Sequence, residues 1–178
     1  MEFKNFAIAS TLFAFLTTVA ADVSIPNGDI PITLQSVFVL LAGLMAGANV
    51  GITSQLIYLM LGVFFPVFAG QDFGFSILAD PSVGYLFGFP VAAFITGILG
   101  HQQTLPKIFL SVIIAQTCLY ISGVLLYYIN AEKTWMEVIQ KGFIDLAFIG
   151  YTKAILTGLL YFIYLKFSSN KQAVTNRE

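Results

Sequence analysis

The sequence predicts an all-α integral membrane protein, built as one bundle of six transmembrane helices. Three observations support this fold class. Hydrophobic residues make up 58% of the 178-residue chain and charged residues only 10%, against about 25% charged in soluble proteins. The apolar residues lie in continuous runs close to the roughly 20 residues that a membrane-spanning helix needs. These runs lack the alternating segments of about ten residues that are typical of a transmembrane β-barrel.

The chain contains six apolar runs, each separated from the next by a break rich in Pro, Gly, Asn or charged residues. The spans are expected at about residues 5–21, 32–48, 51–68, 82–100, 107–129 and 142–166, within a single domain of residues 1–167. The polar segment 168–178 is expected to be a disordered cytoplasmic tail. The first run is longer than the roughly 7–15-residue core of a signal peptide, so we retain it as a helix.

The first span carries small side chains at steps of three and four residues, which places them along one face of a helix. They are Ala7, Ser10, Ala14, Thr17 and Ala21. Small residues allow a second helix to approach closely. The stripe therefore predicts either packing within this bundle or a docking face for a separate membrane subunit. The second and third spans carry glycines for the same reason, together with polar insertions such as Gln35.

The segment 66–89 interrupts the apolar pattern with glycines and the carboxylates of Asp72 and Asp80. Its Asp80-Pro81-Ser82 sequence is typical of a helix start, where Asp or Ser caps free N–H groups and Pro is tolerated in the first turn. We expect this segment to form one wall of a small-molecule site at the outer end of the bundle. Tyr85 lies one turn further along, and aromatic residues such as Phe68 would enclose an apolar ring.

Lys153 is the most informative charge, because it lies about 16 Å into the last span at 1.5 Å per residue. A charged side chain this deep usually faces the bundle interior or a cavity and has a partner. An internal ion pair with Asp145 or Asp80 is one explanation, but Asp145 lies two turns away, too far for direct contact. We therefore expect an anionic group of a ligand to pair with Lys153.

Lysine and arginine positions predict the orientation, because basic residues are enriched in cytoplasmic loops. With both termini in the cytoplasm, five basic residues lie inside and two lie outside. The five are Lys4, Lys107, Lys166, Lys171 and Arg177, and the two are Lys133 and Lys141.

The chain has one His and one Cys, without metal-ligand spacing and without a phosphate-binding glycine loop. We therefore expect no enzyme activity, no metal and no cofactor. The nearly balanced charge gives no indication of nucleic-acid binding.

Several ordered motifs resemble the BioY family, the biotin-binding S components of energy-coupling-factor (ECF) transporters. The matching stretches are Ile30–Gln35 (IPITLQ), Val39–Gly43 (VLLAG), Leu61–Gly70 (LGVFFPVFAG) and Asp80–Pro90 (DPSVGYLFGFP). The resemblance runs from the first span through Lys153.

The resemblance implies a six-helix S-component bundle in the plasma (inner) membrane that captures biotin at the outer face and releases it inward. It also implies an energising partner, made of two ATPases and a membrane coupling protein that docks on the small-residue face of the first span. The biotin carboxylate would satisfy Lys153 and the ureido edge would meet Asp80, Gln35 or Gln116; the reverse orientation stays open.

The family's aspartate three residues before the lysine is Gly150 here, and we hypothesise that Asp80, Ser82 or Tyr151 takes over its hydrogen bonds. Two other functions stay open: an S component for another vitamin such as thiamine or riboflavin, and a non-transporting membrane structural protein.

Overall fold

The computed structural model describes residues 2–175, with side chains through residue 168. The elements, in chain order, are α1 (Phe3–Asp22), β1 (Ser24–Ile25), β2 (Ile32–Thr33), α2 (Gln35–Ala46), α3 (Ala48–Phe64), the 3-10 helices η1 (Ala69–Gln71) and η2 (Phe75–Ala79), α4 (Val83–Leu99), α5 (Leu105–Asn130), α6 (Trp135–Ile139), the π-helical turn η3 (Gln140–Ile144) and α7 (Asp145–Thr175).

The six predicted spans correspond to α1, α2, α3, α4, α5 and α7, which confirms the all-α fold class. Among the described residues, four helical segments are long and apolar enough to cross a membrane: Phe3–Asp22, Ala48–Gln71, Leu105–Asn130 and Trp135–Ser168. The helices α2 and α4 are shorter, with 12 and 17 residues. The second predicted span began at residue 32, but residues 32–33 pair with β1 in an antiparallel hairpin.

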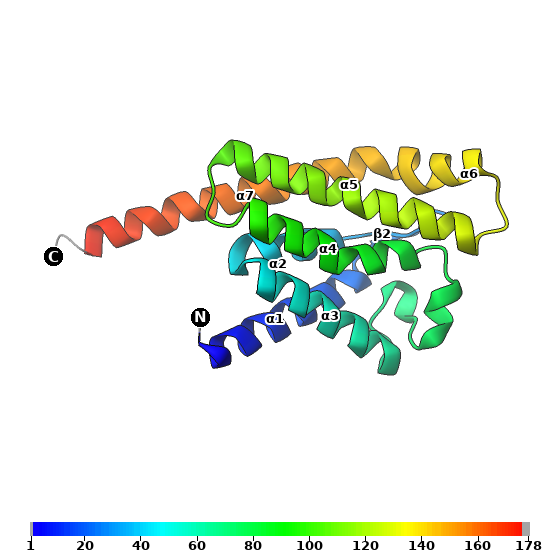
Figure 1. Ribbon diagram of the computed structural model, residues 1–178, viewed down its shortest axis with the longest axis horizontal. Coiled ribbons are helices and arrows are strands. Elements are labelled where there is room, and N and C mark those ends of the chain that lie inside the picture. The colour runs from blue at the N-terminus through cyan, green and yellow to red at the C-terminus, as the bar shows by residue number, and fades with distance from the viewer. Residues whose placement is uncertain (1, 176–178) are drawn as a thin grey trace.

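The helix α4 lies at the centre of the bundle, where it packs against α2, α3 and α5 (Figure 1). A single residue, Gly47, joins α2 to α3 and has a φ of +84°, which reverses the chain direction. Close helix contacts are made at small residues. A Cβ at Gly43 would overlap the Ala93 carbonyl of α4, and a Cβ at Gly97 would overlap the backbone of Ala48. The contact at Gly43 confirms that this glycine of the second span serves close packing, whereas Gly47, predicted to do the same, serves the turn.

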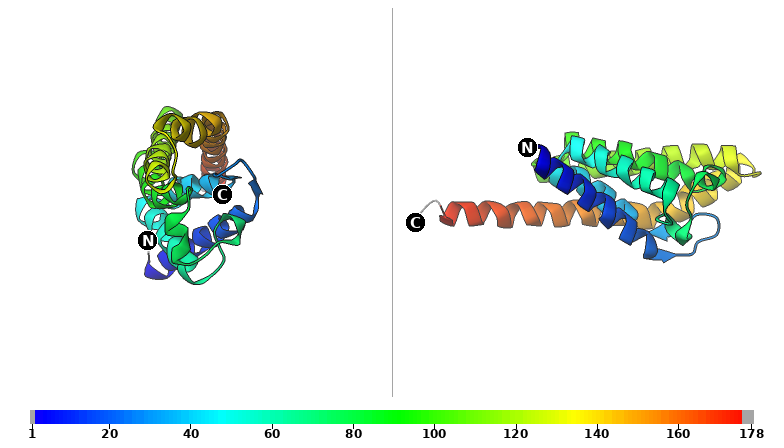
Figure 2. Two further views of the ribbon diagram at one scale, coloured as in Figure 1. Left: turned by 90° about the vertical axis from the view of Figure 1, so that its right-hand side faces the viewer. Right: turned by 90° about the horizontal axis from the view of Figure 1, so that it is seen from below.

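The two termini lie at one end of the bundle, and the hairpin, η1, η2 and α6 lie at the other (Figures 1 and 2). The helix α7 extends past the bundle at the terminal end and continues through Thr175. The predicted disordered tail therefore begins as helix. Residues 168–175 contain neither Pro nor Gly, so nothing in them interrupts the helix of the last span. Residues 176–178 of the predicted tail lie outside the described residues.

The small-residue stripe of α1 packs inside the bundle. Ser10, Ala14, Thr17 and Ala21 are buried, and α1 packs against α2 and α3. The Gln55 amide of α3 donates to the Thr17 hydroxyl at 3.3 Å. The prediction of a partner-docking face is therefore wrong for these four residues, and of the predicted stripe only Ala7 is exposed. A stripe of small residues indicates close approach of a helix, and here that helix belongs to the same chain.

The link before the last span contains structure that the sequence analysis missed. The short helix α6 begins with a capping box, in which the Thr134 hydroxyl accepts from the Glu137 N–H and the Glu137 carboxylate accepts from the Thr134 N–H. The π-helical turn η3 then carries the chain from α6 into α7.

Candidate ligand-binding site

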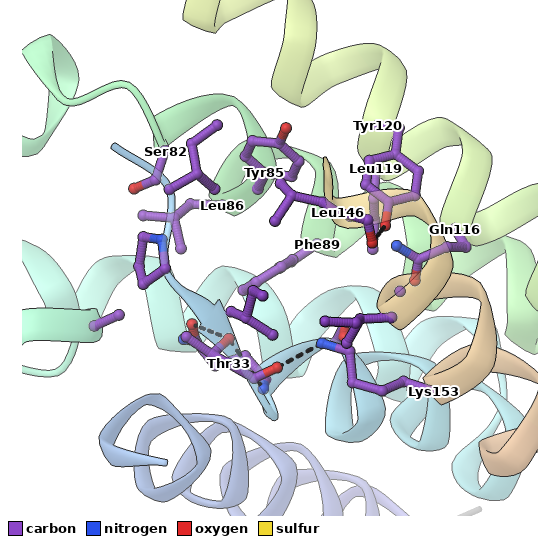
Figure 3. A pocket seen from close by; sticks show the side chains of 18 of the residues that line it. Thr33, Ser82, Tyr85, Leu86, Phe89, Gln116, Leu119, Tyr120, Leu146 and Lys153 are labelled. Atoms are coloured by element: carbon purple, nitrogen blue, oxygen red, sulfur yellow. Dashed lines mark hydrogen bonds between the residues drawn. The ribbon is translucent and has the colours of Figure 1, made fainter. Parts of the chain in front are cut away.

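A cavity lies at the end of the bundle that carries the hairpin, between β2, α2, α4, α5 and α7 (Figure 3). Its volume is about 90 Å³, well below the roughly 300–1,000 Å³ of sites that enclose drug-sized ligands. A ligand of that size therefore requires part of the wall to move. The residues Ile30 to Thr33 line the cavity from outside the helices, as do Phe68 and Ser82.

Lys153 extends into this cavity from α7, as the sequence analysis expected for a charged residue so deep in a span. Its Nζ atom donates to the backbone carbonyl of Thr33 at 2.6 Å. Among the side chains through residue 168, the one ion pair joins Lys133 to Asp29, so Lys153 has no carboxylate partner there. Lys153 forms no ion pair with Asp145, as the two-turn separation predicted, and the Asp145 carboxylate instead accepts from the Gln140 amide at 2.7 Å.

The helix α2 contributes Gln35 to the cavity wall, and neighbouring groups fix its amide. Gln35 Nε2 donates to the Tyr58 hydroxyl at 2.5 Å, and Gln35 Oε1 accepts from the Thr33 hydroxyl at 3.1 Å. The Tyr58 ring in turn packs edge-on against Phe68, with centroids 5.5 Å apart. The buried Tyr58 side chain therefore contacts both Gln35 and Phe68 and fixes this part of the cavity wall.

The start of α4 contributes Ser82 and Tyr85. The helix begins at Val83, as the Asp80-Pro81-Ser82 sequence predicted. The Asp80 carboxylate accepts from the Ser82 N–H at 2.7 Å and from the Ser82 hydroxyl at 2.5 Å. The Tyr85 hydroxyl donates to the Gly142 carbonyl in the π-helical turn, so η3 positions a cavity side chain.

The helix α5 contributes Gln116 and Tyr120, which meet α7 at Gly150. The Tyr120 hydroxyl donates to the Leu146 carbonyl at 2.7 Å. A Cβ at Gly150 would overlap this hydroxyl and would lie 3.0 Å from Gln116 Nε2. The absence of a side chain at Gly150 therefore makes room for both α5 residues.

Six of the nine ligand-binding residues predicted from the sequence line the cavity: Gln35, Phe68, Ser82, Tyr85, Gln116 and Lys153. Asp72, Asp80 and Tyr151 do not. Asp72 is exposed in the loop between η1 and η2, and the Asp80 carboxylate is held by Ser82. The Tyr151 hydroxyl lies 2.9 Å from the Thr117 hydroxyl, on a separate apolar groove between α5, α6 and α7.

Of the three residues hypothesised to take over the hydrogen bonds of the family's aspartate, Ser82 lines the cavity, whereas Asp80 and Tyr151 do not. The structure instead brings Tyr120 and Gln116 against Gly150. The sequence analysis missed the cavity residues Ser36, Tyr120 and Gly150. Ser36 could have been predicted to line a site, because it is a polar residue beside Gln35 in an apolar run. Tyr120 could not, because the chain is rich in Phe and Tyr.

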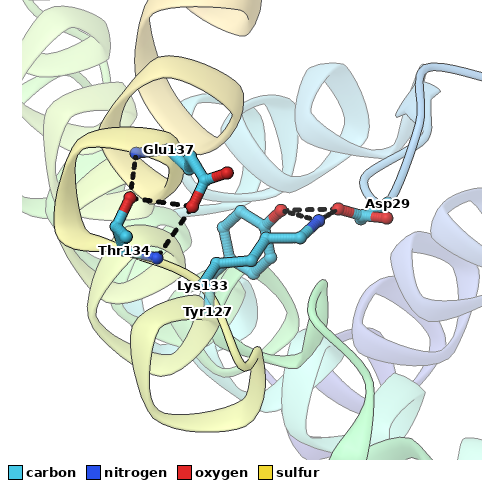
Figure 4. Close-up of polar contacts among 5 residues, drawn as sticks. All are labelled: Asp29, Tyr127, Lys133, Thr134 and Glu137. Carbon is cyan, nitrogen blue, oxygen red and sulfur yellow. Dashed lines mark hydrogen bonds and ion pairs between the residues drawn. The ribbon is translucent and has the colours of Figure 1, made fainter.

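Asp29 attaches the hairpin segment to the end of α5 and to the link that follows it (Figure 4). The Asp29 carboxylate forms an ion pair with Lys133 and accepts from the Tyr127 hydroxyl at 2.6 Å. The hydrogen bonds from Lys133 and Tyr127 lower the pKa of Asp29, and the same ion pair raises the pKa of Lys133. The segment that lines the cavity is thus held at one end by Asp29 and at the other by the Thr33–Lys153 contact.

Comparison with known proteins places this bundle and its cavity in a family. The BioY family model matches residues 2–169. The chain belongs to the BioY family. Among BioY relatives, the probable biotin transporter BioY of Pyrococcus horikoshii is 37% identical over 164 residues, covering 92% of this chain and 87% of the relative. The biotin transporter BioY of Thermotoga maritima is 31% identical, covering 86% of this chain and 91% of the relative.

The BioY fold is also found among solved structures. The crystal structure of the S-component for biotin from an ECF-type ABC transporter superposes with a TM-score of 0.80, at 20% identity, over 93% of this chain and 95% of that one. This agreement supports the six-helix S-component bundle that the motifs predicted.

Proposed function

We propose that this BioY chain is the substrate-binding S component of a biotin uptake system, which captures biotin at the outer face of the plasma (inner) membrane and releases it inward. The observation that carries the proposal is Lys153, a cavity lysine without a carboxylate partner among the described side chains. Biotin offers two hydrogen-bond acceptors for the N–H groups of Lys153: the valerate carboxylate and the ureido carbonyl. The curated relatives named as biotin transporters support the same ligand.

The cavity wall suits a small molecule with an apolar body. Phe89, Leu86 and Leu119 supply apolar surface, while Gln35, Ser82 and Lys153 supply a few placed polar groups. This combination is typical of small-molecule sites. Because the cavity is smaller than such sites, we infer that binding moves residues 30–33 outward and replaces the Lys153–Thr33 hydrogen bond with a contact to biotin.

We infer that transport requires an ECF module of two ATPases and a membrane coupling protein. The chain carries no phosphate-binding glycine loop, so ATP hydrolysis would come from the partner. In this account the chain binds and moves its ligand and is not an enzyme. The excess of basic residues at the terminal end supports cytoplasmic termini. In this proposed orientation the cavity lies near the outer face.

Equilibrium binding of radiolabelled biotin to detergent-purified protein tests the proposal. The expected result is saturable binding that unlabelled biotin competes away and that thiamine and riboflavin leave unchanged. No biotin binding, together with saturable binding of labelled thiamine or riboflavin in the same assay, would assign the chain to another vitamin. Absence of binding of all three would instead favour a structural membrane protein.

A further inference from the structure

Two buried polar atoms in the cavity wall have no hydrogen-bond partner in the protein. They are the Gln116 Oε1 atom on α5 and the Ser36 Oγ atom on α2. The Gln116 side chain is only 4% exposed. Burying a polar atom without a partner destabilises the folded protein, and such atoms in native proteins call for a specific explanation. For an acceptor that lines a cavity, the simplest explanation is a donor on the ligand.

The position of Gln116 is fixed by its neighbours on α7. A Cβ at Gly150 would approach Gln116 Nε2 to 3.0 Å and overlap the Tyr120 hydroxyl. The Tyr120 hydroxyl already donates to the Leu146 carbonyl. Gln116 Oε1 is therefore an unused acceptor on this side of the cavity.

Lys153 supplies donors at the same side. Figure 3 shows Gln116 and Lys153 on the same cavity wall, from α5 and α7, with the Lys153 ammonium directed to Thr33. When the ligand displaces the Thr33 carbonyl from Lys153, all three N–H groups of the ammonium are available to it. This side of the cavity therefore combines a free acceptor with free donors.

That combination discriminates between the two ends of biotin. An ionised carboxylate has acceptors only, so one of its oxygens would face Gln116 Oε1 without a hydrogen between them. A ureido edge carries N–H donors beside a carbonyl acceptor, which matches Gln116 Oε1 and Lys153 Nζ at once.

We propose that Gln116 is a specificity-determining residue, whose Oε1 atom accepts an N–H of the ligand while Lys153 donates to the adjacent carbonyl. This inference rests on the proposed function and deepens it, because it places the ureido ring of biotin at Gln116 and Gly150. The valerate chain then points away from Gln116, so the carboxylate is not the group that Lys153 binds.

The test is a thermodynamic cycle that compares biotin with its two derivatives methylated on one ureido nitrogen. Wild-type protein is expected to bind at least one methylated derivative at least about tenfold more weakly than biotin, since a hydrogen bond to a buried acceptor is lost. In Gln116→Met, which removes the acceptor at similar size, biotin affinity falls about tenfold or more. The same derivative should then lose little further affinity relative to biotin.

Gln55→Met is the matched control. Gln55 is also a fully buried glutamine whose Oε1 atom has no partner, but it lies between α1 and α3 and does not line the cavity. We expect its biotin affinity and its preference between biotin and the methylated derivatives to match those of the wild type.

Three results would overturn the proposal. One is that wild-type protein binds biotin and both methylated derivatives equally well. This measurement does not depend on the folding of any variant. Another is a Gln116→Met protein that keeps wild-type biotin affinity. The last is equal weakening of all three ligands by Gln116→Met, which would indicate a structural role. In each of these cases wild-type protein still binds biotin. If the proposed function itself is wrong, wild-type protein does not bind biotin at all.

Discussion

Lys153 on α7 and Thr33 on β2, 120 residues apart in the chain, are joined by a 2.6 Å hydrogen bond from the ammonium group to the backbone carbonyl. The bond gives a cation within a membrane-spanning helix a neutral acceptor in place of a carboxylate. It also ties the hairpin to the cavity wall. A ligand that binds Lys153 therefore competes with the contact that holds the hairpin, which couples occupancy of the site to the position of this segment.

Gly150→Ala is expected to weaken both folding and biotin binding. Its Cβ would overlap the Tyr120 hydroxyl, and overpacking of this kind costs about 1–3 kcal/mol. Thermal unfolding in detergent and biotin binding measure the two effects. Gly158→Ala is the control on the same helix, because nothing lies closer than 3.3 Å to its Cβ. Tyr120→Phe should partly restore Gly150→Ala, and a Gly150→Ala protein as stable as the wild type would contradict the packing described here.

Asp29→Asn is expected to loosen the hairpin by removing its ion pair with Lys133. Hydrogen–deuterium exchange of residues 24–33 should become faster than in the wild type. Raising the salt concentration should shift the wild type toward the variant, because exposed charges are screened. Asp22→Asn, at an exposed carboxylate near the end of α1, is the control. Unchanged exchange in the variant would show that other contacts hold the segment.

The pH dependence of this contact follows from the direction of the two pKa shifts. The pKa of Asp29 is lowered from 3.8 in the folded protein. The stabilisation that its carboxylate gives to the hairpin is therefore complete above pH 3.8 and is lost as the pH falls through the lowered pKa. The pKa of Lys133 is raised from 10.5, so its contribution is lost only as the pH rises through that higher value. The ratio of the protection factors of wild type and Asp29→Asn, which corrects for the intrinsic pH dependence of amide exchange, should therefore be constant from about pH 5 to pH 9. A ratio that changes within this range would point to another titrating group.

Tyr151→Phe is expected to leave biotin affinity within about twofold of the wild type. Its hydroxyl is paired with Thr117 on the far side of the cavity wall, so removal takes no hydrogen bond from a ligand. Competition binding measures the effect, and Tyr85→Phe is the informative partner because Tyr85 lines the cavity. A large loss in Tyr151→Phe alone would restore the hypothesis that Tyr151 contacts biotin.

The helices could be predicted because a chain in lipid must satisfy its backbone within each span, and long apolar runs leave few alternatives. Lys153 could be recognised because burying a lone charge is costly. Tyr151 was misplaced because successive helical residues point about 100° apart, at 3.6 residues per turn. A neighbour of Gly150 in sequence is therefore not its neighbour in the site.

Other features depend on contacts between distant segments. The small-residue stripe on α1 indicated close packing but not which helix it packs against. The structure shows that α3 is one such partner, because Gln55 of α3 donates a hydrogen bond to Thr17. Asp80 was predicted to contact a ligand, yet its carboxylate is taken by the N–H and hydroxyl of Ser82 two residues on. The meeting of Gln116 with Gly150 joins α5 to α7, and no local pattern in either helix encodes it.

Equilibrium binding of labelled biotin to wild-type and Lys153→Met protein tests the central claim most directly. Lys166→Met, which changes an exposed lysine on the same helix, is the matched control. We predict tight, saturable binding to the wild type and to Lys166→Met, and a loss of at least about tenfold in Lys153→Met, because a charge-assisted hydrogen bond contributes about 1.5–3 kcal/mol. Undiminished biotin binding by a folded Lys153→Met protein would contradict the account.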